Sequence, residues 1–257
     1  MEKWVPMGPV SPLPLPEIGV ASNVMAVWTP VGEVHPNESP LDLSNVPLID
    51  AAEASTFVTR KRAAEHAAGR YALASLLRTL GFEPNDLQII RDQYRKPKLV
   101  WRDADSNSRE GGLQNHSLPE ISLGHSNGIA VAAVSLDGSP IGLDAEPVDA
   151  CRSKNILTMM ASGKELQYLE QLWRNNEDLG IQESTRTWVV KEAVQKACGL
   201  GMYIAPQSFS VLDGNPVSLI HEKVRYNLEF THWQESLDNR TFRFGFSKLI
   251  ESVSSNL

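Results

Sequence analysis

The sequence predicts an α+β fold, and three observations lead to that prediction. Several stretches carry apolar residues at three- and four-residue spacings, which is the pattern of helices that pack on a core. Shorter stretches are apolar or alternate in polarity between glycine, proline and asparagine turns, as strands do. Each half of the chain runs from a helix into short strands that look antiparallel, although no exact repeat is visible.

The overall composition is that of an ordinary folded protein. The chain has 257 residues, of which 42% are hydrophobic and 21% charged, and its length suits one large domain or two small ones. A net charge of −7 argues against a general nucleic-acid binder, which normally carries a basic excess. The two cysteines, Cys151 and Cys198, are too few for a disulfide framework and lack the paired spacing of a zinc site.

The first 20 residues contain five prolines and are predicted to form an extended arm. They have no basic segment followed by an apolar run, so they do not resemble a signal peptide. No stretch approaches the roughly 20 apolar residues that span a bilayer. We therefore expect a cytoplasmic protein with an N-terminal arm over 1–20, an N-terminal α+β subdomain over 21–139 and a C-terminal one over 140–257.

The first half is predicted to contain one long helix. Residues 23–30 have the pattern of a strand, 49–81 that of a helix ending at Gly81, and 87–90 that of a second strand. A turn beginning at Tyr94 should lead into another extended segment at Leu99. The polar, glycine-containing segment 103–119 is expected to be a surface loop.

The second half begins with strands and continues with helices. Strands at 120–123 and 128–134 are expected to flank a polar turn at 124–127 that contains His125. A strand from Pro140 should lead into the acidic segment 144–147. Helical spacing and then alternation predict two helices and three strands, in order 162–173, 185–198, 209–212, 226–230 and 242–246.

Two carboxylates in the acidic segment form a candidate cation site. Asp144 and Glu146 are two residues apart at the end of a predicted strand, so both side chains point to the same face. Carboxylate oxygens on one face suit a hard cation such as Mg²⁺. Two exposed, solvated carboxylates are the alternative, because the Asp-x-Glu pattern by itself is common.

The predicted helix at 185–198 has an apolar side and a charged side. The apolar stripe consists of Val190, Ala193, Val194 and Ala197. On the other side Glu192 and Lys196 are four residues apart and hence neighbours, with Lys191 adjacent. They suit the binding of a charged group, and the alternative is a surface ion pair worth roughly 0.3–0.5 kcal/mol.

Taken in order, these segments resemble the surfactin-type and enterobactin-type 4'-phosphopantetheinyl transferases. The segment 141–146, Ile-Gly-Leu-Asp-Ala-Glu, matches the family's Ile/Val-Gly-x-Asp-x-Glu, and 188–196 matches its Trp-x-x-Lys-Glu-x-x-x-Lys. Weaker matches are Lys96-Pro97-x-Leu99, the segment 122–126 and the segment 61–70. The resemblance extends over about 57–213, with Gly124 standing where the family usually has serine.

The resemblance implies a pseudo-twofold pair of similar α+β subdomains with CoA and Mg²⁺ in the cleft between them. Such an enzyme moves the 4'-phosphopantetheine of CoA onto a serine of an acyl or peptidyl carrier protein, converts the apo to the holo form and releases 3',5'-ADP. Carriers of this kind belong to fatty-acid, polyketide or nonribosomal-peptide synthesis. A monomer that binds neither nucleic acid nor membrane is expected.

The resemblance also implies a role for each matched residue. The Mg²⁺ ligands are expected to be Asp144, Glu146 and Glu192, and Glu192 is the candidate base for the serine proton, directly or through a metal-bound water. Lys196 is expected to assist the departing 3',5'-ADP. The predicted CoA-binding residues are Lys61, Arg62, Lys96, His125 and Lys191, with the choice among Arg60, Lys61 and Arg62 for the 3'-phosphate left open.

Three other functions compete with this one. A binding module that has lost catalysis is disfavoured by the intact Asp144, Glu146, Glu192 and Lys196. A different Mg²⁺ phosphotransferase or hydrolase is disfavoured because the sequence has no Gly-x-x-x-x-Gly-Lys-Ser/Thr loop and no kinase glycine loop. A structural protein would make the ordered occurrence of both signatures a coincidence.

Overall fold

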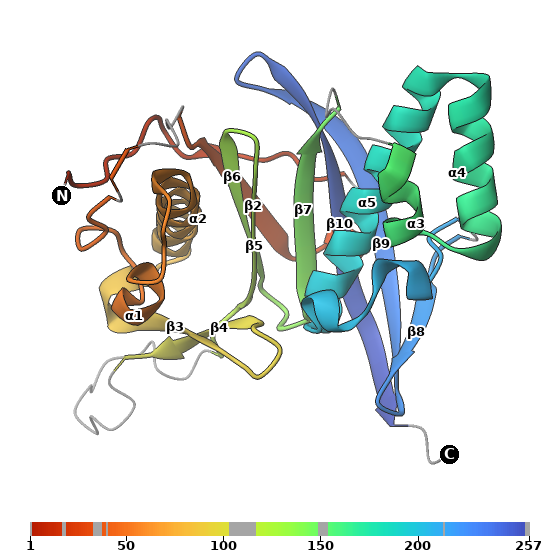
Figure 1. Cartoon of the computed structure of the whole chain (residues 1–257). Coiled ribbons are helices and arrows are strands. Elements are labelled where there is room, and N and C mark those ends of the chain that lie inside the picture. The colour runs from red at the N-terminus through yellow and green to blue at the C-terminus, as the bar shows by residue number, and fades with distance from the viewer. Residues whose placement is uncertain are drawn as a thin grey trace. The chain divides into compact units, whose positions relative to one another are not determined.

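The computed structural model describes residues 2–16, 19–32, 38–39, 41–102, 117–148, 154–212 and 214–254. The chain divides into two compact units (Figure 1). Unit 1 comprises Met1–Leu15, Asn23–Asp92 and Pro97–Gly138, and unit 2 comprises Pro16–Ser22, Gln93–Lys96 and Ser139–Leu257. Unit 2 thus includes residues 21–22, 93–96 and 139, which the sequence placed in the N-terminal subdomain, and most of the N-terminal arm belongs to unit 1.

Unit 1 contains a four-stranded antiparallel sheet covered by a long helix. The sheet has the order β1-β2-β6-β5, formed by β1 (Ser11–Pro12), β2 (Val24–Pro30), β5 (Glu120–Ser126) and β6 (Ile129–Ser135). Helix α2 (Arg60–Thr79) packs on β2, β5 and β6. A separate two-stranded sheet pairs β3 (Leu87–Arg91) with β4 (Pro97–Trp101) after the short helix η2 (Pro84–Asp86).

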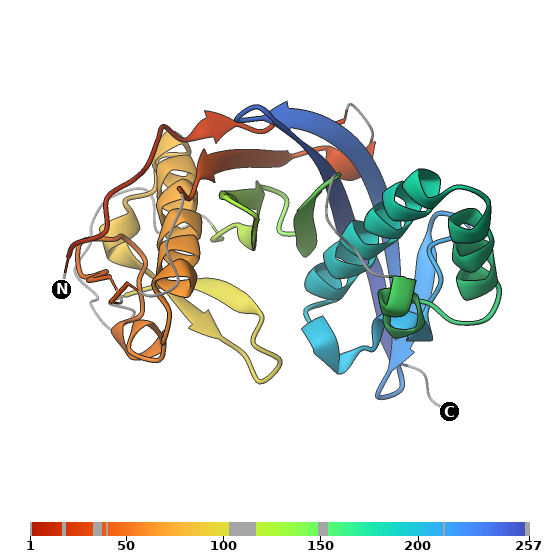
Figure 2. The same ribbon diagram turned by 45° about the horizontal axis from the view of Figure 1, so that its top comes forward.

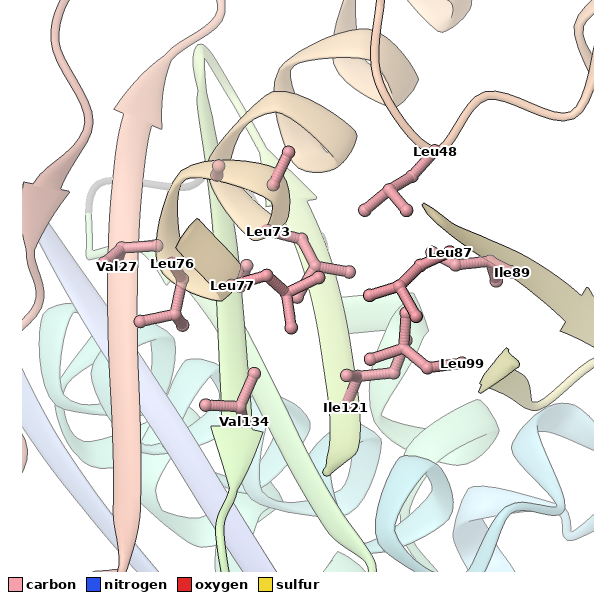
Figure 3. Packing of buried hydrophobic residues seen from close by; sticks show 13 residues of the cluster. Val27, Leu48, Leu73, Leu76, Leu77, Leu87, Ile89, Leu99, Ile121 and Val134 are labelled. Carbon is pink, nitrogen blue, oxygen red and sulfur yellow. The ribbon is translucent and has the colours of Figure 1, made fainter. Parts of the chain in front are cut away.

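The core of unit 1 lies between α2 and these strands. Leu73 and Leu77 of α2 point toward Leu87, Leu99 and Ile121 (Figure 3). All five side chains are buried, and burying a leucine or isoleucine contributes about 1.5–3 kcal/mol. This packing fixes α2 against β5 and so fixes where the first turn of α2 meets the end of that strand.

In unit 1 two predicted strands are present, and the long predicted helix is interrupted. The strands expected at 23–30 and 87–90 are confirmed. The single helix expected over 49–81 is wrong, because α1 (Ala51–Ala54) ends before α2 begins at Arg60. Ser55 and Thr56 hydroxyls donate to the carbonyls of Ala52 and Glu53, and such local bonds compete with helix continuation. The loop expected at 103–119 lies mostly outside the described residues.

The proline-rich arm packs on unit 1 over most of its length. Trp4 and Leu13 are buried, and Ser11 pairs with Trp28 of β2 in the antiparallel sheet. The apolar residues between the prolines therefore provide the burial that holds an otherwise extended segment in place.

Unit 2 has a second four-stranded antiparallel sheet covered by helices (Figure 2). The sheet has the order β7-β10-β9-β8, formed by β7 (Ile141–Pro147), β8 (Val217–His221), β9 (Val224–Leu237) and β10 (Arg240–Ser254). Helix α5 (Glu177–Cys198) packs on β7, β9 and β10, and α4 (Gly163–Asn175) packs on α5. The shorter helices are η1 (Gly19–Ala21), η3 (Lys154–Ile156), α3 (Leu157–Met160), η4 (Gly201–Tyr203) and η5 (Pro206–Ser208).

The predictions for unit 2 gave the right type for two helices and two strands and the wrong type for one segment. Both helices are confirmed, but α5 begins at Glu177 rather than at residue 185, with Asn176 capping the backbone N–H of Leu179. The strand predicted at 209–212 is wrong, because Val211 donates its backbone N–H to the Glu165 side chain instead of to a strand. In the described part of the chain, no helix is long and apolar enough to cross a membrane.

Candidate functional site

The candidate site in unit 2 starts from one face of β7. Gly142, Asp144 and Glu146 alternate along this strand and therefore share a face, as the sequence predicted. Asp144 pairs with Gly245 of β10, and Asp144 as a whole residue is only 7% exposed. A carboxylate in this position has been removed from bulk water, so it requires a cation or hydrogen bonds nearby.

Two glycines let α5 lie directly on this face. A Cβ atom on Gly142 would overlap the backbone carbonyl of Ala193, and one on Gly245 would overlap that of Val189. The helix backbone therefore contacts the strand backbone where any larger residue would hold the two apart. This close approach brings Glu192 and Lys196 to the carboxylates of β7.

Lys196 is the centre of the resulting cluster. Its Nζ lies 2.7 Å from Asp144 Oδ1 and donates to the carbonyl of Leu143 at 3.0 Å. Burial, the largest single influence, lowers the pKa of Lys196, but the Asp144, Glu192 and Glu146 carboxylates together outweigh it and raise the pKa above its ordinary value. The structure thus brings the four residues expected from the sequence into one electrostatic cluster.

The carboxylates around Lys196 are candidate ligands for a divalent cation. Among the residues that the structure describes, no group of three His, Cys, Asp or Glu side chains is close enough together to hold a metal ion as it stands. Asp144 Oδ2, however, is buried and has no hydrogen-bond partner within the described part of the chain. An unpaired buried carboxylate oxygen suits a hard cation, provided that the Lys196 ammonium moves from Oδ1 and that the Glu146 and Glu192 carboxylates move closer.

Lys191 does not lie on the charged side of α5 where the sequence placed it. Its side chain is 0% exposed and its Nζ lies 2.5 Å from Glu165 Oε2 of α4. The ammonium also donates to the carbonyls of Pro206 and Phe209. The expected exposed position is wrong because Glu165, which is distant in sequence, provides a buried partner that a helical periodicity cannot reveal.

A second cluster lies in unit 1, where α2 begins. His125 lies within β5, on the face that packs on α2, and follows Ile121 and Leu123 along that face. The sequence placed His125 in a turn, which is wrong, because the turn begins only at Asn127. His125 Nε2 lies 2.6 Å from an Arg62 guanidinium nitrogen, and Nδ1 lies 3.5 Å from Glu65 Oε2. The structure therefore joins His125 to the basic run.

Glu65 balances the charge of this second cluster. Its Oε1 lies 3.8 Å from Lys61 Nζ, and burial raises the pKa of Glu65 against the opposing effect of Lys61 and Arg62. Lys61 is 63% exposed, and Arg62 lies over the Phe57 ring at 5.8 Å. Two exposed cations and one histidine at a helix N-terminus form a surface that suits a phosphate.

Arg60 is directed away from this cluster. Its guanidinium pairs with Glu2 at 2.7 Å and with Glu38 at 2.8 Å. These two carboxylates raise the pKa of Arg60, and the hydrogen bond that Arg60 donates to Glu2 is the largest cause. The geometry therefore favours Lys61 and Arg62 over Arg60 in the choice that the sequence left open.

The remaining residues of the sequence motifs lie in unit 2. The Lys96 side chain crosses Gly199, the left-handed cap of α5, where a Cβ atom would meet Lys96 Cδ at 2.7 Å. Trp188 packs against an apolar cluster formed by α3 and α4. Trp188 is thus an anchor of α5 in the unit 2 core, and Lys96 lies at the negative end of that helix.

Glu165 is the residue that sequence reasoning missed. A usable signal existed, because Glu165, Leu169 and Trp173 fall at i, i+4 and i+8 of α4, and Leu169 and Trp173 belong to an apolar cluster. A charged residue in an apolar stripe indicates a buried partner. The partner itself, Lys191, could not have been chosen from spacing.

Comparison with known proteins gives one family match. Residues 140–245 match the model of the 4'-phosphopantetheinyl transferase superfamily, which transfers phosphopantetheine from CoA to carrier proteins. The matched segment begins just before β7 and ends within β10, so it includes Asp144, Glu146, Glu192 and Lys196. No curated protein matches the chain.

Proposed function

We propose that this protein transfers the 4'-phosphopantetheine of CoA to a serine of an acyl or peptidyl carrier protein and releases 3',5'-ADP. The observation that carries the proposal is the gathering of Asp144, Glu146 and Glu192 around Lys196 within the segment that matches the superfamily. The motifs before residue 140, at Lys96 and His125, support the narrower surfactin-type and enterobactin-type group.

Asp144, Glu146 and Glu192 would hold Mg²⁺. Asp144 Oδ2, buried and unpaired among the residues that the structure describes, supports this assignment, and the Glu146 and Glu192 carboxylates would supply the oxygen ligands that such an ion prefers. When bound, the ion would neutralise the CoA pyrophosphate and polarise the phosphoryl group under attack.

The reaction exchanges one P–O bond for another. The carrier serine Oγ forms a bond to the β-phosphorus of CoA, and the bond from that phosphorus to the oxygen of 3',5'-ADP breaks. We assign Glu192 to accept the serine proton. It is the carboxylate of the cluster that lies on α5 rather than on β7, and its side chain is partly exposed, so a carrier serine could reach it. Lys196 would move from Asp144 to the phosphates and stabilise the charge that develops on the leaving group.

The cluster in unit 1 would bind the 3'-phosphate of CoA. Arg62 and His125 already lie 2.6 Å apart, and Lys61 is exposed beside them. A phosphate would attract all three groups and favour protonation of His125. Lys96 is assigned to the nucleotide end of CoA.

The test is to incubate the purified protein with CoA, Mg²⁺ and a panel of apo carrier proteins and to measure intact carrier masses. We expect the carrier to gain the mass of one phosphopantetheine group, on its serine and only without EDTA. A serine-to-alanine carrier is the acceptor control. A folded protein that binds CoA and modifies no carrier would favour a binding module without catalysis.

A further inference from the structure

The buried ion pair between α4 and α5 lies next to the proposed catalytic residues. Lys191 and Glu165 have side chains that are 0% and 3% exposed, and Lys191 immediately precedes Glu192. Burial lowers the pKa of Lys191 and the adjacent Glu165 carboxylate opposes that effect. Two charges in such a place need a reason, because replacing a buried pair by apolar residues is often neutral or stabilising.

The pair connects three separate segments of unit 2. Lys191 Nζ contacts Glu165 on α4 and the carbonyls of Pro206 and Phe209 in the segment after α5. Glu165 Oε1 in turn accepts the backbone N–H of Val211 at 2.8 Å. Its Oε2 lies against the Lys191 ammonium, so the two buried charges face each other directly.

The surface under α5 explains why such an anchor matters. Helices ordinarily keep their rotation and axial position through side-chain ridges that fit into grooves. At Gly142 and Gly245 the sheet offers no side chain, so the close contact there does not by itself resist sliding or rotation of α5. A polar anchor on the helix can supply that resistance, and Lys191 is the fully buried charged residue of α5.

We propose that Lys191 and Glu165 are positioning residues that set α5 so that Glu192 and Lys196 face Asp144. Lys191 then binds no phosphate of CoA, in contrast to the role that the family resemblance suggested. This inference rests on the proposed function, since it concerns the same site.

The test compares Lys191→Met, Glu165→Gln and the double variant with the wild type. Lys164→Met is the matched control, because Lys164 is exposed on α4 next to Glu165. For Lys191→Met we expect kcat to fall tenfold or more, the KM for CoA to stay within about threefold, and Mn²⁺ affinity to fall severalfold. The control should change none of the three.

The double variant separates positioning from stability. It removes both charges, so we expect it to regain the melting temperature lost by Lys191→Met while keeping the low kcat and the weak Mn²⁺ binding. Recovery of kcat together with the melting temperature would show that the pair serves stability alone and would overturn the inference. A tenfold rise in the calorimetric Kd for CoA with kcat unchanged would overturn it as well, by making Lys191 a phosphate ligand.

Failure of the proposed function gives a different result. A folded wild-type protein that modifies no carrier contradicts the transferase assignment, whatever the variants do. In that case the Mn²⁺ affinities still decide the inference: weaker binding by Lys191→Met and by the double variant, but not by Lys164→Met, supports positioning, and unchanged binding overturns it.

Discussion

At the scale of single residues, the proposed chemistry depends on Glu192. Replacing it by glutamine keeps the size of the side chain but removes the base and one metal oxygen charge, so we expect Glu192→Gln to lower kcat by about 100-fold or more. The fold should persist, because Glu192 is only partly buried. Intact-mass rates with circular dichroism as the folding control measure both effects, and normal transfer by a folded variant would remove Glu192 as the base.

His125 and Arg60 make a matched pair for CoA binding. His125 contacts Arg62, whereas Arg60 in the same helical turn is paired with Glu2 and Glu38. We expect His125→Ala to raise the KM for CoA about tenfold, since a hydrogen bond to a charged group is worth roughly 1.5–3 kcal/mol. Arg60→Ala should leave that KM nearly unchanged, and equal effects of the two variants would contradict the assignment.

At the scale of elements, the contact of α5 with β7 should be sensitive to one methyl group. In Gly142→Ala the new Cβ would overlap the backbone of Ala193, which cannot turn aside as a side chain can, so α5 must shift. We expect a loss of roughly 1–3 kcal/mol of stability together with reduced transfer. Thermal denaturation and carrier modification measure the two.

Gly69→Ala is the control for that substitution. Gly69 lies inside α2, and apart from the backbone of its own helix a Cβ there would meet no heavy atom of the described residues within 4 Å. Since alanine favours a helix interior over glycine by about 0.5–1 kcal/mol, Gly69→Ala should stabilise the protein. Destabilisation of the same size by both variants would mean that the contact between α5 and β7 is not the cause.

The junction of α1, α2 and β3 should make stability depend on pH. His66 is buried, and burial, assisted by Arg70 on the same helix, lowers the pKa of His66 to about 3. Arg62 and Arg91 act in the same direction and Glu53 of α1 opposes them. In the unfolded state His66 binds a proton near pH 6.5, whereas in the native state it binds one only near pH 3. The stability that neutral His66 contributes is therefore fully present above pH 6.5 and is lost as the pH falls toward 3.

His66→Gln should remove part of this dependence. Between pH 7 and pH 5 the contribution of His66 is roughly 2 kcal/mol, from about 1.4 kcal/mol per pH unit below 6.5. His232 of β9 has a pKa lowered to about 4 and contributes in both proteins, so the difference between wild type and variant isolates His66. Urea denaturation of both proteins at pH 7 and pH 5 gives that difference. If wild type and His66→Gln lost the same free energy of unfolding between the two pH values, the role of His66 would be contradicted.

At the scale of the whole molecule, periodicity predicted the types of most elements, the segment 209–212 excepted, but not the contacts between distant ones. The alternation in β2 and the apolar stripe of α5 follow from short-range spacing, and both were predicted. The start of α5 was missed because its first turns are polar and are held by the Asn176 cap. Lys191 was misplaced because its burial depends on Glu165 in another helix.

The proposed CoA contacts in both units can be tested on the whole chain by hydrogen exchange. With Mg²⁺ and CoA, we expect slower amide exchange at the first turn of α2 and the end of β5 in unit 1, and at β7 and α5 in unit 2. Bound ligand raises the free energy of local opening where it makes contacts. The unit 1 segments contain Arg62 and His125, and the unit 2 segments contain Asp144 and Glu192.

Dephospho-CoA is the matched ligand for this experiment, because it keeps the pyrophosphate and lacks only the 3'-phosphate. It should protect β7 and α5 as CoA does and should lose most of the protection at α2 and β5. The reason is that Arg62, Lys61 and His125 would then have no phosphate to bind, whereas the Asp144 cluster would meet the same pyrophosphate. Equal protection of α2 by both ligands would separate the unit 1 cluster from the 3'-phosphate, and protection confined to unit 2 would remove unit 1 from the CoA site.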